Sequence, residues 1–329
     1  MRDARAFLAA AGFGAARLSP LPSDASHRRY ARLSGGPIPA LLMDAPPPED
    51  VRPFLRVARH IAGIGLSSPA IIAADAAAGF LLIEDFGEAT HAALLDAGAD
   101  PLLLYLEAAE TLAALHDATP PADLPAWDAA AMARATAATF LDWWWPAAMG
   151  APADAQLRAG LDEALRAMLT PHAERRGFVH RDYFPANLMR LDDRDGPRRT
   201  GLLDFQDAAL GHPAYDVVSL VEDARRDVAP EIRSAVVARY LEARGGLDRE
   251  AFAAAFAACA AQRHLRVAAL WVRLARRDAK PHYLVHGPRC WRLLGAALEH
   301  PATRPLREFL DAHVPPALRR NPVAVTEPA

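Results

Sequence analysis

The sequence predicts an α+β fold with two lobes, a small lobe built on an antiparallel sheet and a larger lobe that is mostly helical. Two observations lead to this prediction. From about residue 15 to residue 85, short strand-like runs alternate with turn residues. From about residue 100 onward, apolar residues recur at helical spacing, and only residues 176–206 return to a strand-like pattern. A chain of 329 residues is long enough for two such lobes.

The small lobe is expected to comprise residues 1–87. A helix is expected after the PPPED run at 46–50, because Glu49 and Asp50 suit the positive end of a helix dipole. The strands are expected to be short, with turn residues between the first two. They are predicted at Arg29–Leu33, Ala40–Asp44 and Gly79–Glu84.

The large lobe is expected to comprise residues 88–315, after a hinge near 84–88. Its helices are predicted from runs of apolar residues at a spacing of three and four. They are expected at 100–117, 127–145, 153–170, 229–243, 248–276 and 287–299. The proline-rich residues 316–329 are expected to form a loose tail.

Composition argues against several classes of protein. A net charge of −3 without a strongly basic domain argues against nucleic-acid binding, and no stretch reaches the ~20 apolar residues that span a bilayer. Cys259 and Cys290 are too few and too distant for a disulfide framework, which favours the cytoplasm. At the N-terminus, Asp3 favours a short helix ending near Gly12 over a signal peptide. No pattern indicates an obligate protein partner.

Two short motifs carry the candidate chemistry. VHRDYFPANLM (179–189) places Asp182 and Asn187 five residues apart, and GLLDFQD (201–207) places Asp204 after another apolar run. If the runs near 188–190 and 201–204 pair as a hairpin, Asn187 and Asp204 come close together. Carboxylate and amide oxygens suit Mg²⁺, which takes its other ligands from water and phosphates. An aspartate nearby could orient an incoming hydroxyl and accept its proton, as phosphoryl transfer requires.

The order of the two motifs strengthens this interpretation. H-R-D-x-x-x-x-N followed by D-F is the pair formed by the catalytic loop and metal loop of kinases. Either half alone could be an acid that caps a turn. Both halves in order, each at the end of a strand and downstream of a sheet-rich lobe, favour a kinase.

The chain resembles the aminoglycoside phosphotransferase and choline kinase superfamily, which has the protein-kinase-like fold. It is most similar to one branch, the bacterial N-acetylmuramate/N-acetylglucosamine anomeric kinases of cell-wall recycling. The resemblance extends over almost the whole chain. It is carried by SDASHRRYARL (23–33), LLMDAPPPED (41–50), GFLLIEDFG (79–87), HRDYFPANLM (180–189), LLDFQDAALGHPAYDVVSLVEDARRDV (202–228), RLARRDAKPHYL (273–284) and PRCW (288–291).

This resemblance implies a role for each matching residue. Asp182 would be the catalytic base, and Asn187 and Asp204 would bind the metal ions. Asp216 would brace the catalytic loop by accepting backbone hydrogen bonds, although an ordinary helix cap is an equal alternative. His180 would pack beneath the loop as a structural residue.

The nucleotide site departs from the kinase pattern in two ways. No glycine occurs from Ala15 to Ser34, so a serine version of the phosphate loop would rely on Ser23 and Ser26. The strand lysine that holds the phosphates is also missing, since the only lysine in the chain is Lys280. Arg28 is the candidate replacement. Backbone groups near Glu84 and Phe86 would hydrogen-bond the adenine.

The acceptor site is expected in the helical lobe. N-acetylmuramate carries a lactyl carboxylate, for which an arginine is the natural partner. Gln262 and His264 could bind sugar hydroxyls, and the tryptophans at 143–145 could stack on a sugar ring or pack the lobe. The arginines that could bind the carboxylate, or could simply face solvent, are Arg263, Arg266 and Arg289.

We therefore expect an ATP-dependent sugar kinase that uses Mg²⁺ and phosphorylates the anomeric hydroxyl of N-acetylmuramate or N-acetylglucosamine, with a role in peptidoglycan recycling. A phosphotransferase of the same fold acting on an aminoglycoside, a choline-like amine or another alcohol is the first alternative. A pseudokinase that serves as a binding module is the second, because the strand lysine is missing.

Overall fold

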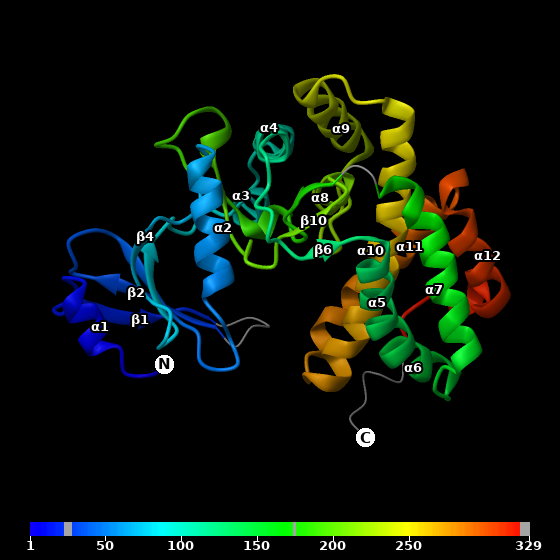
Figure 1. Cartoon of the computed structure of the whole chain (residues 1–329), viewed down its shortest axis with the longest axis horizontal. Helices are drawn as coiled ribbons and strands as arrows, with labels where there is room; N and C mark the ends of the chain where they lie inside the picture. Colours follow the sequence, from blue (N-terminus) through cyan, green and yellow to red (C-terminus); the bar gives the residue numbers. More distant parts are fainter. Residues whose placement is uncertain (23–27, 174–175, 323–329) are drawn as a thin grey trace. The chain divides into compact units, whose positions relative to one another are not determined.

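The computed structural model of the chain describes residues 1–22, 28–173 and 176–322 (Figure 1). By its internal packing the chain divides into two compact units. Unit 1 comprises residues 1–118 and 185–208, and unit 2 comprises residues 119–184 and 209–329. The predicted catalytic loop therefore begins in unit 2, and the chain passes into unit 1 after Phe184.

Unit 1 contains an antiparallel sheet with strand order β1-β2-β3-β5-β4. The predicted strands correspond to β2, β3 and β5, and the predicted helix is α2 (Arg52–Gly63). The sequence did not reveal β1 or β4, because β1 is exposed along its length and β4 is only partly buried, so neither shows a clear alternation. The strands are β1 (Arg17–Pro20), β2 (Arg29–Ser34), β3 (Ala40–Asp44), β4 (Ile71–Asp75) and β5 (Phe80–Glu84).

The two faces of this sheet have different surroundings. On one face, Leu33, Leu42 and Leu82 from three neighbouring strands join Leu8 of α1 (Arg5–Ala10) in a buried cluster. Because side chains alternate along a strand, the cross-strand partners Tyr30 and Met43 lie on the opposite face.

A hairpin of β8 (Leu188–Arg190) and β9 (Thr200–Leu202) also belongs to unit 1, and Leu188 pairs with Leu202. The predicted hairpin is thus confirmed. It is fastened to α4 (Pro101–Asp117), where Glu107 Oε2 lies 2.8 Å from Arg190 Nη1. A second helix of this unit, α3 (His91–Asp96), begins at the capping residue Thr90.

Unit 2 is mostly helical and is organised around α10 (Arg249–Arg277), which is buried without interruption from Ala255 to Leu265. Figure 1 shows α5, α7, α11 and α12 gathered near it, and α5 and α11 pack directly against it. The other helices are α5 (Ala129–Thr139), α6 (Trp145–Met149), α7 (Ala155–Leu169), α8 (Ala214–Val221), α9 (Pro230–Arg244), α11 (Gly287–Leu298) and α12 (Arg304–His313).

A small sheet in unit 2 has the strand order β6-β10-β7. Its strands are β6 (Ala126–Trp127), β7 (Gly177–Val179) and β10 (Ala209–Gly211). The predicted start of the helix at residue 127 is therefore wrong, because residue 127 belongs to β6 and α5 begins at Ala129. Trp127 pairs with Gly211 as a strand residue, and the helix starts after Asp128, whose side chain accepts a hydrogen bond from Ala131 N.

Part of the expected tail, residues 316–322, makes side-chain contacts with the helices of unit 2. Trp144 Nε1 donates to the carbonyl of Arg320 at 2.9 Å, and Trp291 Nε1 donates to Asn321 Oδ1 at 3.1 Å. A proline-rich sequence disfavours a long helix, but such a segment can still pack against the helices of unit 2. Here two indole N–H groups hold it by hydrogen bonds. Residues 323–329 lie outside the described part of the chain.

The predicted fold class is confirmed: unit 1 carries the antiparallel sheet, and the remainder of the chain is largely helical. In the three described ranges, no helix combines the length and the apolar character needed to cross a bilayer.

Arg2 anchors the N-terminus to the sheet, and its loss should destabilise unit 1. Asp44 is fully buried and accepts hydrogen bonds from Arg2 N and Nε, both at 2.7 Å. We expect Arg2→Ala to lower the free energy of unfolding by about 2 kcal/mol, because a buried acceptor loses its side-chain donor. Arg2→Ala/Asp44→Asn should recover part of this loss.

Thermal and urea denaturation of the purified variants measure this effect. Arg5→Ala is the matched control, because Arg5 pairs with the exposed Asp3 and its loss should change stability by less than about 0.5 kcal/mol. An equal loss in Arg2→Ala and Arg5→Ala would contradict the role of the buried pair.

Candidate functional site: the catalytic loop and the hairpin

The predicted catalytic loop in unit 2 is held by one buried carboxylate. Asp216, in the first turn of α8, is fully buried. Its Oδ2 accepts a hydrogen bond from His180 N at 2.6 Å, and its Oδ1 accepts one from Arg181 N at 2.9 Å. Arg181 has φ of 76°, a left-handed conformation that is costly for a residue with a side chain. The two hydrogen bonds offset that cost and fix the turn directly before Asp182.

Arg263 of α10 holds the loop from its other side. Its Nη1 donates to the carbonyl of Arg181 at 3.0 Å and lies 3.5 Å from the hydroxyl of Tyr215. The side chain of Arg181 in turn stacks on Trp127, with its guanidinium carbon 4.1 Å from the ring centroid. Both backbone groups of Arg181 are thus engaged, so the loop cannot relax without breaking buried contacts.

Asp182 presents a carboxylate that is held in its ionised form. Its side chain is 41% exposed, and Oδ1 lies 3.9 Å from Arg263 Nη1. Partial burial opposes ionisation, but the positive charges of Arg263, Arg266 and Arg181 outweigh it and lower the pKa of Asp182. The group therefore stays charged through neutral and mildly acidic pH, ready to accept a hydrogen bond from a hydroxyl.

His180 is a packing residue in this structure. Its side chain is fully buried, and its ring meets the buried ring of Tyr183 edge-on at 5.6 Å. The placement agrees with a structural role rather than a catalytic one.

Asn187 and Asp204 lie at the open end of the hairpin in unit 1. The backbone N–H of Leu203 donates to the carbonyl of Asn187 at 3.0 Å. Asn187 and Asp204 therefore lie next to the last backbone hydrogen bond between the two strands. Asp204 has φ of 56°, and its side chain is 51% exposed. Together with Arg181, it is one of three non-glycine residues with positive φ in the described ranges. Two of these three lie in the predicted motifs, which is where functional strain concentrates.

The donor set at this end of the hairpin fits a hard divalent cation. It offers one amide and one carboxylate, and Gln206 Nε2 orients the carboxylate by donating to Asp204 Oδ1 at 2.8 Å. Within the described ranges, no group of three His, Cys, Asp or Glu side chains gathers as a closed metal cage. An open pair of oxygen ligands suits a cation that takes its remaining ligands from phosphates and water.

Arg28 reaches this pair from the sheet of unit 1. Its Nε lies 3.1 Å from Glu49 Oε2 and its Nη1 lies 4.0 Å from Asp204 Oδ1, and its side chain is only 14% exposed. Burial alone would lower the pKa of Arg28, but the charges of Tyr30, Asp204 and Glu49 raise it. A guanidinium is thus fixed beside the predicted metal ligand.

The position of Arg28 relative to β3 bears on the missing strand lysine. Met43 on β3 is fully buried opposite Tyr30 of β2. Arg28 precedes Tyr30 by two residues, so it points to the same face of the sheet one step further along. Arg28 directly precedes β2, the strand next to β3. Sequence patterns did not indicate Glu49 as its partner, because the same acid also suits the start of a helix.

Of the remaining candidates for nucleotide binding, the structure describes Glu84 and Phe86. Glu84 accepts hydrogen bonds from Arg194 Nη2 at 2.5 Å and from Ala70 N at 3.1 Å, and Arg194 stacks on Phe86 at 5.0 Å. Both side chains are engaged within unit 1, so a role in adenine binding would fall to their backbone. Ser23 and Ser26 lie outside the described residues.

Several acceptor candidates turn out to hold the core of unit 2. Gln262 is fully buried and donates to Met132 O at 3.1 Å and to Thr136 Oγ1 at 2.9 Å. His264 Nε2 lies 2.6 Å from Glu222 Oε2. Trp144, the middle tryptophan of the run, is fully buried and stacks on Phe140 at 4.9 Å. These three polar or aromatic residues are not available to a sugar.

The arginine candidates divide in a similar way. Arg266 Nη2 donates to the hydroxyl of Tyr215 at 3.2 Å, and Arg289 Nη2 pairs with Asp227 Oδ2 at 2.8 Å. Arg263 is bound to the catalytic loop as described above. Each of these guanidinium groups already has an oxygen partner.

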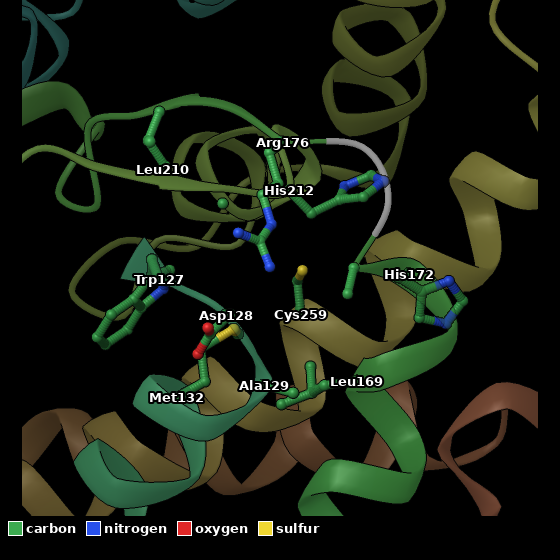
Figure 2. A pocket seen from close by; sticks show the side chains of 12 residues that line it. Trp127, Asp128, Ala129, Met132, Leu169, His172, Arg176, Leu210, His212 and Cys259 are labelled. Atoms are coloured by element: carbon green, nitrogen blue, oxygen red, sulfur yellow. The ribbon is translucent and has the colours of Figure 1, made fainter. Parts of the chain in front are cut away.

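Two cavities in unit 2 are separate from this loop. One, of about 30 Å³, is shown in Figure 2 among Trp127, Asp128, His212 and Cys259. It has room for water but not for a sugar. Burial raises the pKa of the Cys259 thiol to about 12, so that thiol is unreactive.

The second cavity, of about 450 Å³, lies among α9, α10 and α11 and has a mainly apolar lining, including Phe252 and Phe256. Its buried acid, Glu222, already pairs with Arg233 at 2.5 Å and with His264. The one carboxylate that lines this cavity is therefore already paired.

Known proteins provide an independent comparison. An N-acetylmuramate/N-acetylglucosamine kinase of Caulobacter vibrioides is 38% identical over 96% of this chain and 97% of its own. A protein of the same name from Pseudomonas aeruginosa is 37% identical over 90% of this chain and 88% of its own. These relatives confirm the predicted class of enzyme, a kinase related to sugar kinases.

Solved structures confirm the predicted fold. A choline/ethanolamine kinase family protein from Mesorhizobium loti covers 94% of this chain and 98% of its own, with a TM-score of 0.64 and 16% identity. A putative aminoglycoside phosphotransferase from Ralstonia eutropha covers 91% of this chain and 97% of its own, also with a TM-score of 0.64 and 16% identity.

The family itself follows from a sequence model described as the phosphotransferase enzyme family, which matches residues 17–254. This match takes in the sheet of unit 1, the hairpin and the catalytic loop. Together with the relatives that align over nearly the whole chain, it shows that this chain belongs to the phosphotransferase enzyme family.

Proposed function

We propose that this chain is an ATP-dependent sugar kinase that phosphorylates the anomeric hydroxyl of N-acetylmuramate, N-acetylglucosamine or both, and so yields a sugar 1-phosphate for peptidoglycan recycling. The four curated relatives, 33–38% identical, all have the name N-acetylmuramate/N-acetylglucosamine kinase. The single structural observation that carries the proposal is Asp182, a partly exposed and ionised carboxylate on a loop clamped by Asp216.

In this mechanism Asp182 accepts a hydrogen bond from the acceptor hydroxyl, orients that oxygen toward the terminal phosphate and takes its proton as transfer proceeds. The lowered pKa of Asp182 keeps the carboxylate ready but makes it a weak base. That suits a loose transition state, in which positioning matters more than early proton removal.

We assign the metal-binding role to Asn187 and Asp204 and propose Mg²⁺ as the ion. Bound there, it would neutralise charge on the phosphates of ATP. Gln206 keeps the carboxylate of Asp204 oriented, and Arg28 supplies a further positive charge beside it. Arg28 would thus replace the missing strand lysine, with Glu49 holding it in place.

The other elements of the proposal follow the family pattern. Residues 1–87 would form the nucleotide-binding lobe, in which the backbone near Glu84 and Phe86 binds adenine and Ser23 and Ser26 lie near the phosphates. Residues 88–315 would carry the catalytic loop and the acceptor site, with His180 and Asp216 supporting the loop. We place the enzyme in the cytoplasm, where ATP is available, and propose no obligate protein partner.

The charges around Asp182 argue against a cationic acceptor. Arg181, Arg263 and Arg266 all lower the pKa of Asp182, so three positive charges lie near its carboxylate. An aminoglycoside or a choline-like amine would have to enter against this field. A neutral or anionic sugar would not.

Turnover against a panel of acceptors tests the proposed function. With ATP and Mg²⁺, the purified protein should phosphorylate N-acetylmuramate or N-acetylglucosamine, and should be at least about 10²-fold less efficient with kanamycin or choline, because electrostatic repulsion at that site disfavours cations. Phosphorus NMR of the product should show a 1-phosphate.

Two results would contradict the proposal. Transfer to kanamycin or choline but to neither sugar would favour the alternative phosphotransferases. Absence of ATP turnover with every acceptor, by folded protein that still binds nucleotide, would favour a pseudokinase.

Arg28 should contribute to nucleotide binding. We expect Arg28→Ala to raise KM for ATP by about 10- to 100-fold, since a charge-assisted contact to phosphate contributes roughly 1.5–3 kcal/mol. Arg28→Lys should retain part of the affinity, and Glu49→Gln should raise KM by a smaller factor. Steady-state kinetics with varied ATP measure these effects.

Arg29→Ala is the matched control, because Arg29 is the neighbouring arginine but is exposed. The same KM for ATP in Arg28→Ala and Arg29→Ala would remove Arg28 from the nucleotide site.

A further inference from the structure

One arginine of unit 2 differs from the others in its surroundings. The guanidinium of Arg225 lies 4.8 Å from the ring centroid of Phe184, 5.5 Å from that of Trp271 and 6.0 Å from that of Tyr283. We call these four residues the Arg225 cluster. The rings of Trp271 and Tyr283 stack nearly parallel beside the guanidinium, with centroids 5.3 Å apart and an interplanar angle of 2°.

Among the residues that the structure describes, no salt bridge joins this guanidinium to a carboxylate, although its charge acts on the neighbouring Asp223, where burial raises the pKa of the acid and Arg225 opposes that rise. Asp223, the nearest acid along the chain, uses its Oδ1 to accept a hydrogen bond from the backbone N–H of Arg225 at 2.8 Å. By contrast, Arg289 pairs with Asp227, and Arg263 donates to the carbonyl of Arg181. Arg225 thus keeps its side-chain donors available in an aromatic and partly desolvated setting.

Several positive charges lie around the Arg225 cluster, together with the buried side chain of Asp223. His286 packs on Trp271, with ring centroids 5.6 Å apart. Burial lowers the pKa of His286, and the charges of Arg225 and Arg289 lower it further. The acid nearest to Arg289, Asp227, is shared with Arg292 and is 63% exposed, so it is a weak counter-charge.

The Arg225 cluster is also close to the proposed chemistry. Phe184, which supports the guanidinium, follows Asp182 by two residues, or at most about 7 Å of backbone. A sugar whose hydroxyl meets Asp182 could therefore extend a substituent toward Arg225. An anionic substituent would gain most, because a guanidinium binds a carboxylate through two parallel hydrogen bonds.

We propose that Arg225 is a specificity residue that binds the carboxylate of an acidic amino sugar, so that the enzyme prefers N-acetylmuramate over sugars without the lactyl acid. This inference rests on the proposed sugar kinase function. It assigns the carboxylate to Arg225 rather than to Arg263, Arg266 or Arg289, because those three already have oxygen partners.

The experiment compares three acceptors: N-acetylmuramate, its methyl ester and N-acetylglucosamine. The acid and the ester differ in charge but hardly in shape. In the wild type, kcat/KM should be higher for the acid than for the ester. In Arg225→Met, which keeps an apolar stem between the rings, the acid-to-ester ratio should fall about 10- to 100-fold, mainly through KM for the acid, because a charge-assisted interaction made in the ground state is lost.

Two further variants separate recognition from general damage. Arg225→Lys keeps the positive charge but cannot bind bidentately, so it should restore part of the ratio. Arg292→Met removes an exposed arginine nearby and should leave the ratio unchanged.

Three results would overturn the inference. The first is a wild type that does not distinguish the acid from its ester. The second is an unchanged ratio in Arg225→Met. The third is an equal loss on all three acceptors in Arg225→Met and Arg225→Lys, which would mean that Arg225 only supports the fold. Failure of the wild type to phosphorylate any of the three sugars would instead reject the proposed function, and with it this inference.

Discussion

The carboxylate of Asp216 is the constraint on which the proposed catalytic loop depends. It accepts the backbone N–H groups of His180 and Arg181 and so stabilises a left-handed turn that a non-glycine residue would otherwise avoid. Arg263 binds the carbonyl of the same residue from α10. Charge-assisted hydrogen bonds in a buried setting fix the backbone on both sides of the turn. The orientation of the following residue, Asp182, is therefore restricted. The same arginine also lowers the pKa of Asp182. Arg263 therefore both fixes the backbone next to Asp182 and keeps the carboxylate of Asp182 ionised.

Sequence patterns predicted much of this arrangement because it depends on local order. The strands β2, β3 and β5 and the hairpin of β8 and β9 follow from alternation and turn residues. The five-residue spacing of Asp182 and Asn187, with Asp204 downstream and each motif at the end of a strand, indicates phosphoryl transfer. Each of these features is set by residues close together in the chain.

Features set by packing between distant elements could not be predicted. Gln262 and His264 have the chemistry of sugar-binding residues, yet α10 buries both against other helices. Glu49 could be recognised as a helix-dipole residue but not as the partner of Arg28, because that contact depends on how β2 approaches α2. Arg225 is one arginine among many in the sequence, and only the convergence of aromatic rings from the catalytic loop, α10 and residues 281–286 sets it apart.

The most direct test of the account is the kinetics of Asp182→Asn. The substitution keeps the shape of the side chain and removes its negative charge, while the contacts of Asp216 and Arg263 with the loop backbone remain possible. The expected result is a fall in kcat of about 10²- to 10⁴-fold, the usual loss for a general base, with the affinity for ATP and the melting temperature little changed. A variant that folds and binds ATP normally and turns over within about twofold of the wild type would contradict the account.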